Sequence, residues 1–165
     1  VMSNLGLHEF CRKGDYQLVC TDVGDRHVLE KMIGCGYMIG GEQSGHTIFR
    51  EFATTGDGEL TALQFIQAYC EAGVPASELV SCCAQYPQEL INVPVSAMGG
   101  AKQRIMADDR LWEQVRFQEE LLHGDGRILV RPSGTEALIR VMVEAKTVET
   151  AHNVAQALAD LIKTL

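Results

Sequence analysis

The chain has 165 residues, a net charge of −8 and 46% hydrophobic residues, which is typical of a globular protein rather than a disordered one. Its length suits one ordinary domain or two small ones, and no apolar run approaches the ~18 residues that a membrane span needs. An acidic chain without a basic block is a poor nucleic-acid binder, because phosphate contacts supply most of the non-specific affinity. We therefore expect no nucleic-acid partner and no membrane partner.

The predicted elements of the first half alternate between helices and strands, which indicates an α/β arrangement. Strand-forming residues and glycine-bounded apolar runs predict strands at 16–21, 37–40 and 47–52. The helical spacing of apolar residues predicts helices at 5–13, 26–33, 59–72 and 76–82.

The pattern changes after a polar junction at about 83–89. Strands are predicted at 90–95, 127–131 and 136–145, and helices at 108–122 and 148–164. The order β-α-β-β-α indicates an antiparallel sheet covered by two helices, an α+β unit. Because Pro94 cannot donate to a ladder, the first of these strands should lie at an edge or a bulge. The sequence thus predicts two domains, 1–83 and 84–165.

The charge differs between these two halves. Residues 1–83 carry five basic and eleven acidic side chains, a net charge of −6, whereas residues 84–165 carry nine and eleven, a net charge of −2. An anionic ligand would therefore meet less repulsion in the second half.

The six cysteines lack the spacing of a disulfide framework. No Cys-x-x-Cys pair occurs, and Cys82 and Cys83 are adjacent, which would strain a bridge. The five histidines are scattered, whereas a structural zinc site needs four clustered ligands. The sequence therefore favours reduced thiols in a cytoplasmic protein, without a metal site.

The loop between the last two predicted strands carries groups that bind phosphate. Ser133 and Thr135 offer hydroxyl groups, and Gly134 would let the backbone turn its amides inward. Arg131 and Arg140 can supply guanidinium groups from the flanking strands. The same residue types also suit a plain hairpin turn with two exposed arginines, so the loop by itself leaves both interpretations open.

A second candidate site lies in the glycine-rich loop at 40–46. Glu42 and Ser44 are two residues apart and would face the same side of an extended backbone, where they could bind paired sugar hydroxyls. A glycine-rich turn with solvated polar groups is the alternative. Gly24 and Asp25 lie in a strand-to-helix loop, where Asp25 could also simply cap the helix.

Taken in order, five motifs resemble the α-D-phosphohexomutase superfamily. They lie at residues 1–7, 23–26, 40–46, 55–58 and 131–136. The Glu-Gln-Ser-Gly-His form of the loop at 42–46 is more similar to the branch that acts on glucosamine phosphates than to phosphomannomutases and phosphoglucomutases. The resemblance covers essentially the whole chain.

The resemblance implies a fold and a set of site residues. Family members have four domains, so residues 1–83 would be the C-terminal part of an α/β third domain, and residues 84–165 a TBP-like fourth domain. His46 would sit beside the reaction centre and manage protons. The sugar would be bound by Gly24, Asp25, Glu42 and Ser44, and the non-reacting phosphate by Arg131, Ser133, Gly134, Thr135 and Arg140.

The resemblance also implies a reaction, the interconversion of glucosamine 6-phosphate and glucosamine 1-phosphate in amino-sugar metabolism. The family uses an active-site phosphoserine and Mg²⁺ held by an Asp-Gly-Asp-Gly-Asp-Arg loop. No segment here matches the serine loop, and residues 23–26 contain one aspartate. We expect Mg²⁺ in the full-length isomerase, no cofactor bound by this chain, and no mutase activity from the chain alone.

Two other functions remain open: a stand-alone module that binds phosphorylated sugars, and a fragment of a phosphomannomutase or phosphoglucomutase. The expected partners are a hexosamine phosphate and the rest of the mutase chain. A third domain cut through its sheet would expose an open edge and apolar surface. Residues 1–83 are therefore expected to be less stable than 84–165 or to associate with a partner chain, including a second copy.

Overall fold

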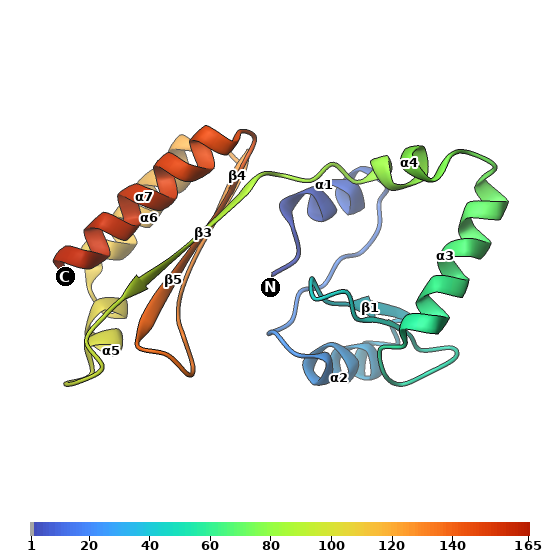
Figure 1. The fold of residues 1–165 in the computed structure, drawn as a ribbon, viewed down its shortest axis with the longest axis horizontal. Helices are drawn as coiled ribbons and strands as arrows, with labels where there is room; N and C mark the ends of the chain where they lie inside the picture. The colour runs from blue at the N-terminus through green and yellow to red at the C-terminus, as the bar shows by residue number, and fades with distance from the viewer. Residues whose placement is uncertain (1) are drawn as a thin grey trace. The chain divides into compact units, whose positions relative to one another are not determined.

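The computed structural model describes residues 2–165, which form two compact units that divide between Gln85 and Tyr86. Each unit has its own sheet: a two-stranded sheet in the first and a three-stranded sheet in the second (Figure 1). No helix among the described residues is both long enough and apolar enough to cross a membrane.

The first unit contains four α-helices, a 3₁₀ turn and one hairpin among its described residues. Its elements are α1 (Leu5–Lys13), α2 (Asp25–Cys35), β1 (Ile39–Gly41), β2 (Thr47–Phe49), α3 (Gly58–Ala72), α4 (Ala76–Leu79) and the turn η1 (Val80–Cys82). The side chain of Asn4 caps α1 by accepting a hydrogen bond from the Gly6 amide, and Asp57 caps α3 in the same way. The helices expected from the sequence are thus present, and α1 and α3 each begin after an Asn or Asp cap.

The strand predicted at 16–21 is wrong. This segment is extended but pairs with no strand, and Gln17, Leu18 and Val19 make no hydrogen bond to any described residue. A β-strand forms only where a second strand pairs with it, and side chains that favour strands do not by themselves provide that second strand. The segment connects α1 to α2, and Tyr16 at its start donates its amide to the Cys11 carbonyl at 2.8 Å.

The first unit buries few apolar side chains. Met32 of α2 and Ile48 of β2 are each 2% exposed, and α3 buries no residue at all. On α3, Leu63 is 64% exposed and Ile66 is 54% exposed. Since apolar burial is the dominant stabilising term in folding, the described residues of this unit contribute little to its stability.

The second unit is a three-stranded antiparallel sheet with its helices packed against it. Its elements are β3 (Gln88–Pro94), α5 (Ala101–Met106), α6 (Asp109–Leu121), β4 (Gly126–Pro132), β5 (Leu138–Ala145) and α7 (Val148–Thr164). The strand order β3-β5-β4 puts β3 at an edge, where Pro94 was expected. The short helix α5 was not predicted, because six residues following Gly99 and Gly100 are too few for a periodic signal.

The core of this unit lies between β5 and its helices. Ile139, Val141 and Val143 alternate along β5 and are completely buried. From α7, Leu158 and Ala155 are also completely buried, as the helical spacing of apolar residues predicted. The predicted fold class, α/β elements followed by an antiparallel α+β unit, is therefore confirmed.

Candidate functional site

The two loops predicted to contact a sugar are joined by a hydrogen bond in the first unit. The amide of Gly24, which precedes α2, donates to Oε1 of Glu42. Gly24 has φ of 125°, a conformation that favours glycine. Gly24 and Glu42, eighteen residues apart in the sequence, thus form one site.

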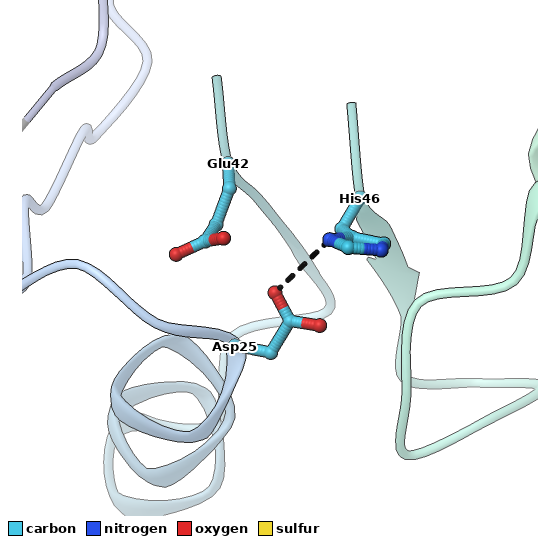
Figure 2. A group of neighbouring side chains, drawn as sticks. All are labelled: Asp25, Glu42 and His46. Carbon is cyan, nitrogen blue, oxygen red and sulfur yellow. Dashed lines mark ion pairs between the residues drawn. The ribbon is translucent and has the colours of Figure 1, made fainter. Parts of the chain in front are cut away.

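Asp25, Ser44 and His46 complete this site, and Figure 2 shows Asp25 and His46 beside Glu42. Nδ1 of His46 lies 3.5 Å from Oδ1 of Asp25 and 3.3 Å from Oγ of Ser44. The Ser44 hydroxyl also donates to Oε2 of Glu42 at 3.2 Å. The five residues named from the sequence therefore converge, with hydroxyl, carboxylate and imidazole groups all partly accessible to a ligand.

The loop reaches this arrangement through a turn rather than through the extended backbone that the sequence suggested. The amide of Gly45 donates to the Glu42 carbonyl at 3.0 Å, and the amide of Glu42 donates to the His46 carbonyl at 2.9 Å. Gly45 has φ of 97°, which a residue with a side chain rarely adopts. The tight turn brings the Ser44 side chain back over Glu42.

Glu42 is held in its charged form. Its pKa lies below the ordinary value of 4.5, chiefly because the Gly24 amide donates to the carboxylate. The Ser44 hydroxyl, Asp25 and the nearby His46 act in the same direction, while burial opposes them. A charged carboxylate is a strong acceptor for two sugar hydroxyl groups.

We expect the link between the two loops to weaken at low pH. A lowered carboxyl pKa means that the interaction is fully present above 4.5 and is lost as pH falls through the lower pKa of the folded state. The Gly24 amide proton should therefore shift upfield in an NMR titration with a midpoint below 4.5. The E42Q variant should abolish the transition, and a midpoint at or above 4.5 would contradict the assignment.

Asp25, Glu42 and His46 also raise the question of a metal ion, since their ligand atoms all lie within 4.8 Å of one another. Mg²⁺ prefers an octahedral shell of oxygen atoms. Here only two of the three donors are carboxylate oxygens, and the third is an imidazole nitrogen. The group does not fit Mg²⁺, and no step of the chemistry is assigned to a metal at this position.

The loop predicted to bind phosphate connects β4 to β5 in the second unit. The Ser133 amide donates to the Leu138 carbonyl at 3.0 Å, which closes the hairpin, and Ser133 is 5% exposed. Its Oγ accepts from the Glu136 amide at 3.2 Å, so the hydroxyl hydrogen remains to donate to a ligand. Gly134 and Thr135 are exposed at the tip. Gly134 does not adopt the positive φ that glycine alone favours.

Two arginines face each other across the strands that carry this loop. Arg131 of β4 is the direct cross-strand partner of Arg140 of β5, and like charges placed directly opposite are destabilising. Arg140 pairs with Glu136 at 3.1 Å, whereas the side chain of Arg131 has no ion pair or hydrogen bond to any described residue. Nε of Arg140 is buried and unpartnered. An anion would relieve this repulsion.

Lys102 of α5 also supports the loop, and sequence reasoning missed it. Its Nζ donates to the Ser133 carbonyl at 2.8 Å and to the Glu136 carbonyl at 3.0 Å. These bonds fix both ends of the turn around Gly134. The signal was absent from the sequence because Lys102 is 31 residues from Ser133 and lies on a helix too short to be predicted.

The K102M variant should loosen the loop without unfolding the unit. Loss of two charge-assisted hydrogen bonds, each contributing up to about 1.5–3 kcal/mol, should speed amide exchange at Gly134 and Thr135 at least about tenfold. Exchange at Val141 in the centre of β5 should not change. The K163M variant, which removes a lysine paired with Asp160 on α7, serves as the control. Equal exchange in both variants would contradict a supporting role for Lys102.

The first unit thus presents a loop with carboxylate, hydroxyl and imidazole groups, and the second unit presents a loop flanked by two arginines. Residues 1–86 match the phosphoglucomutase/phosphomannomutase alpha/beta/alpha domain III, and residues 90–161 match the phosphoglucomutase/phosphomannomutase C-terminal domain. The chain belongs to the phosphoglucomutase/phosphomannomutase family.

Curated relatives include the phosphoglucosamine mutases of Ligilactobacillus salivarius and Caldicellulosiruptor bescii. They are 46% and 48% identical to this chain over 163 and 164 residues, which is 99% of the chain in both cases. The matched region is 35% and 36% of their respective lengths. The chain therefore spans about a third of the curated relatives that it matches.

Solved structures show the same fold at low sequence identity. An N-acetylphosphoglucosamine mutase of Aspergillus fumigatus has a TM-score of 0.83 and 19% identity, and the match covers 99% of this chain and 37% of that one. The same enzyme in complex with GlcNAc-6P and magnesium has a TM-score of 0.77.

Proposed function

We propose that this chain supplies the sugar-binding and phosphate-binding loops of a phosphoglucosamine mutase. In that enzyme, glucosamine 6-phosphate and glucosamine 1-phosphate are interconverted by an intramolecular phosphotransfer, with Mg²⁺ held elsewhere in the full-length protein. The curated relatives carry that name. The observation that carries the proposal is the facing pair Arg131 and Arg140, which have excess positive charge beside a loop rich in hydroxyl and amide donors.

On the sugar side, Glu42 and Ser44 would bind adjacent hydroxyl groups. The carboxylate accepts from hydroxyl donors, and its lowered pKa keeps it charged at neutral pH. Gly24 and Asp25 orient this carboxylate from the start of α2. His46, with Nδ1 turned toward Asp25 and Ser44, would leave Nε2 to exchange a proton with a substrate hydroxyl.

On the phosphate side, Arg131 would pair with the non-reacting phosphate, with Arg140 as a second guanidinium. Ser133 and Thr135 would donate hydroxyl groups and Gly134 its amide. Since Arg140 already pairs with Glu136, binding of an anion would have to share or displace that carboxylate. The main contribution is therefore assigned to Arg131.

The chain alone should carry out no mutase reaction, because phosphoryl transfer needs a nucleophile and a metal site that it does not supply. We place the enzyme in the cytoplasm, where its six cysteines would remain the free thiols that the structure shows. A stand-alone module that binds phosphorylated sugars would use the same residues without catalysis.

Titration with glucosamine 6-phosphate tests both binding loops. Amide resonances of Gly134 and Thr135 should shift at millimolar ligand, together with those of Gly24 and Ser44. Inorganic phosphate should shift only the first pair, because it offers no sugar hydroxyls. The absence of any shift at Gly134 with either ligand would overturn the phosphate assignment, and shifts at Gly24 with phosphate alone would overturn the sugar assignment.

A further inference from the structure

The motif at residues 55–58 has no role in either proposed site, although it lies directly before α3. Asp57 ties this segment to the helix. Its carboxylate accepts hydrogen bonds from the amides of Glu59 and Leu60 at 2.9 and 3.0 Å. Its carbonyl accepts from the Thr61 hydroxyl at 2.6 Å. The turn before α3 is therefore fixed in place by the helix that it caps.

Gly56 in this turn lies against the side chain of His46. A methyl group on Gly56 would lie 3.1 Å from Cβ, 3.4 Å from Cδ2 and 3.5 Å from Cγ of His46. Because non-bonded carbon atoms pack best at about 3.5–4.0 Å, even the smallest side chain at position 56 would crowd the histidine. The turn can come this near to His46 because residue 56 is a glycine.

The contact with Gly56 is on the edge of the ring that faces away from Asp25 and Ser44. Nδ1 of His46 lies 3.5 Å from Oδ1 of Asp25 and 3.3 Å from Oγ of Ser44. Figure 2 shows the other ring nitrogen, Nε2, on the side away from Asp25. Cδ2, which is next to Gly56, is bonded to Nε2 and not to Nδ1. Two polar groups thus hold one edge of the imidazole, and the turn backs the other edge.

His46 has little room to move between these two sides. A side-chain hydrogen bond is lost at about 3.6 Å, and the two Nδ1 distances are already 3.3 and 3.5 Å. The backbone at His46 is fixed as well, because its carbonyl accepts from the Glu42 amide at 2.9 Å and β2 begins at Thr47. A side chain at position 56 would therefore turn the ring, and the turned ring would lose its contacts at Nδ1.

We propose that Gly56 is a positioning residue for His46: without a side chain, it lets the turn before α3 back the ring, so that Nδ1 stays bonded to Asp25 and Nε2 faces a substrate hydroxyl. An ionised carboxylate can only accept, so Nδ1 carries the ring hydrogen and Nε2 keeps its lone pair. Nε2 is then ready to take a proton from a sugar hydroxyl. This use of Nε2 rests on the proposed function, whereas the contact between Gly56 and His46 does not.

Alanine substitutions at two glycines of the same turn test the proposal. G56A adds a methyl group against His46, whereas G58A is the matched control, because a methyl group on Gly58 would meet no atom within 4 Å. Neither glycine has the positive φ that alanine avoids, so the backbone suits alanine at both positions. The readout is the tautomer ratio of the His46 imidazole, taken from the NMR chemical shifts of its two ring nitrogens under conditions where the ring is neutral.

We expect G56A to lower the ratio of the Nδ1–H form to the Nε2–H form about two- to tenfold, the range for loss of one hydrogen bond. G58A should leave the ratio unchanged. D25A should lower the ratio on its own, and G56A added to D25A should then change it little, because both substitutions act on the same hydrogen bond. Equal ratios in G56A and G58A would overturn the proposal, and so would fully additive effects of G56A and D25A.

Two further measurements separate a positioning role from a loss of structure. Amide exchange at Ile48 and Leu60 should be the same in G56A as in the unsubstituted chain, and faster exchange at both would make Gly56 merely structural and overturn the proposal. A nuclear Overhauser effect between the α-protons of Gly56 and Hδ2 of His46 is expected in the unsubstituted chain. Its absence contradicts the proposal even if G56A does not fold. Failure of the proposed sugar site has a different signature, the lack of a Ser44 amide shift on titration with glucosamine 6-phosphate.

Discussion

Replacing Arg131 by alanine should weaken binding of glucosamine 6-phosphate by about 10- to 150-fold, which corresponds to about 1.5–3 kcal/mol for a charge-assisted hydrogen bond. The effect should be large because the Arg131 guanidinium has no partner among residues 2–165 that an anion would have to displace. The Gly134 and Thr135 amide shifts, followed against ligand concentration, give the dissociation constant.

Two further arginine variants make this measurement specific. R116A removes an exposed arginine of α6 in the same unit and should leave the affinity unchanged, because it alters net charge but not the loop. R140A should weaken the binding of glucosamine 6-phosphate less than R131A does, since Arg140 already pairs with Glu136. Equal losses from R131A and R116A would show that only general charge matters, and would refute a specific phosphate site.

Replacing Leu158 by alanine should destabilise the second unit by about 2–5 kcal/mol, the range for large-to-small changes in a well-packed core. Leu158 on α7 is completely buried in the cluster that includes Val141 and Val143. The single tryptophan of the chain, Trp112, packs against the same cluster. Its fluorescence during urea unfolding therefore reports the stability of this unit.

The matched control is L121A, which truncates a leucine of α6 that is 54% exposed. Surface substitutions of this kind usually change stability by less than about 0.5 kcal/mol. In L158A, amide exchange at Met32 and Ile48 of the first unit should stay as it is, because these residues belong to a separate unit. A loss of protection at Met32 that matches the loss at Val141 would show that the two units unfold together.

Local sequence patterns were sufficient for most elements of the fold. Helix α7 follows from an apolar residue at every third or fourth position and from Thr147, whose hydroxyl accepts from the Thr150 amide. Strand β3 was placed at an edge because of Pro94. These predictions succeed because the determining interactions lie within one turn or one strand.

The two features that the sequence did not predict correctly both depend on contacts between distant parts of the chain. Residues 16–21 have strand-forming side chains, but whether they form a strand depends on a neighbour that local propensity does not specify. Lys102 became visible only when α5 and the β4–β5 turn were seen together. Neither the pairing of a strand with a distant neighbour nor the contact of Lys102 with the β4–β5 turn leaves a periodic signal in the sequence.

The amino-acid sequence specifies which chemical groups are present: an acidic and hydroxyl-bearing loop at 42–46, an arginine-flanked loop at 131–140, and the order of motifs that indicated the family. How those groups pair follows from the folded arrangement. The Gly24 amide donates to Glu42, Asp25 lies beside His46, and Arg140 pairs with Glu136 while the Arg131 side chain has no partner in the described chain. The physical reason is that a side chain's charge and donors are local properties, whereas its partners depend on how distant backbone segments pack.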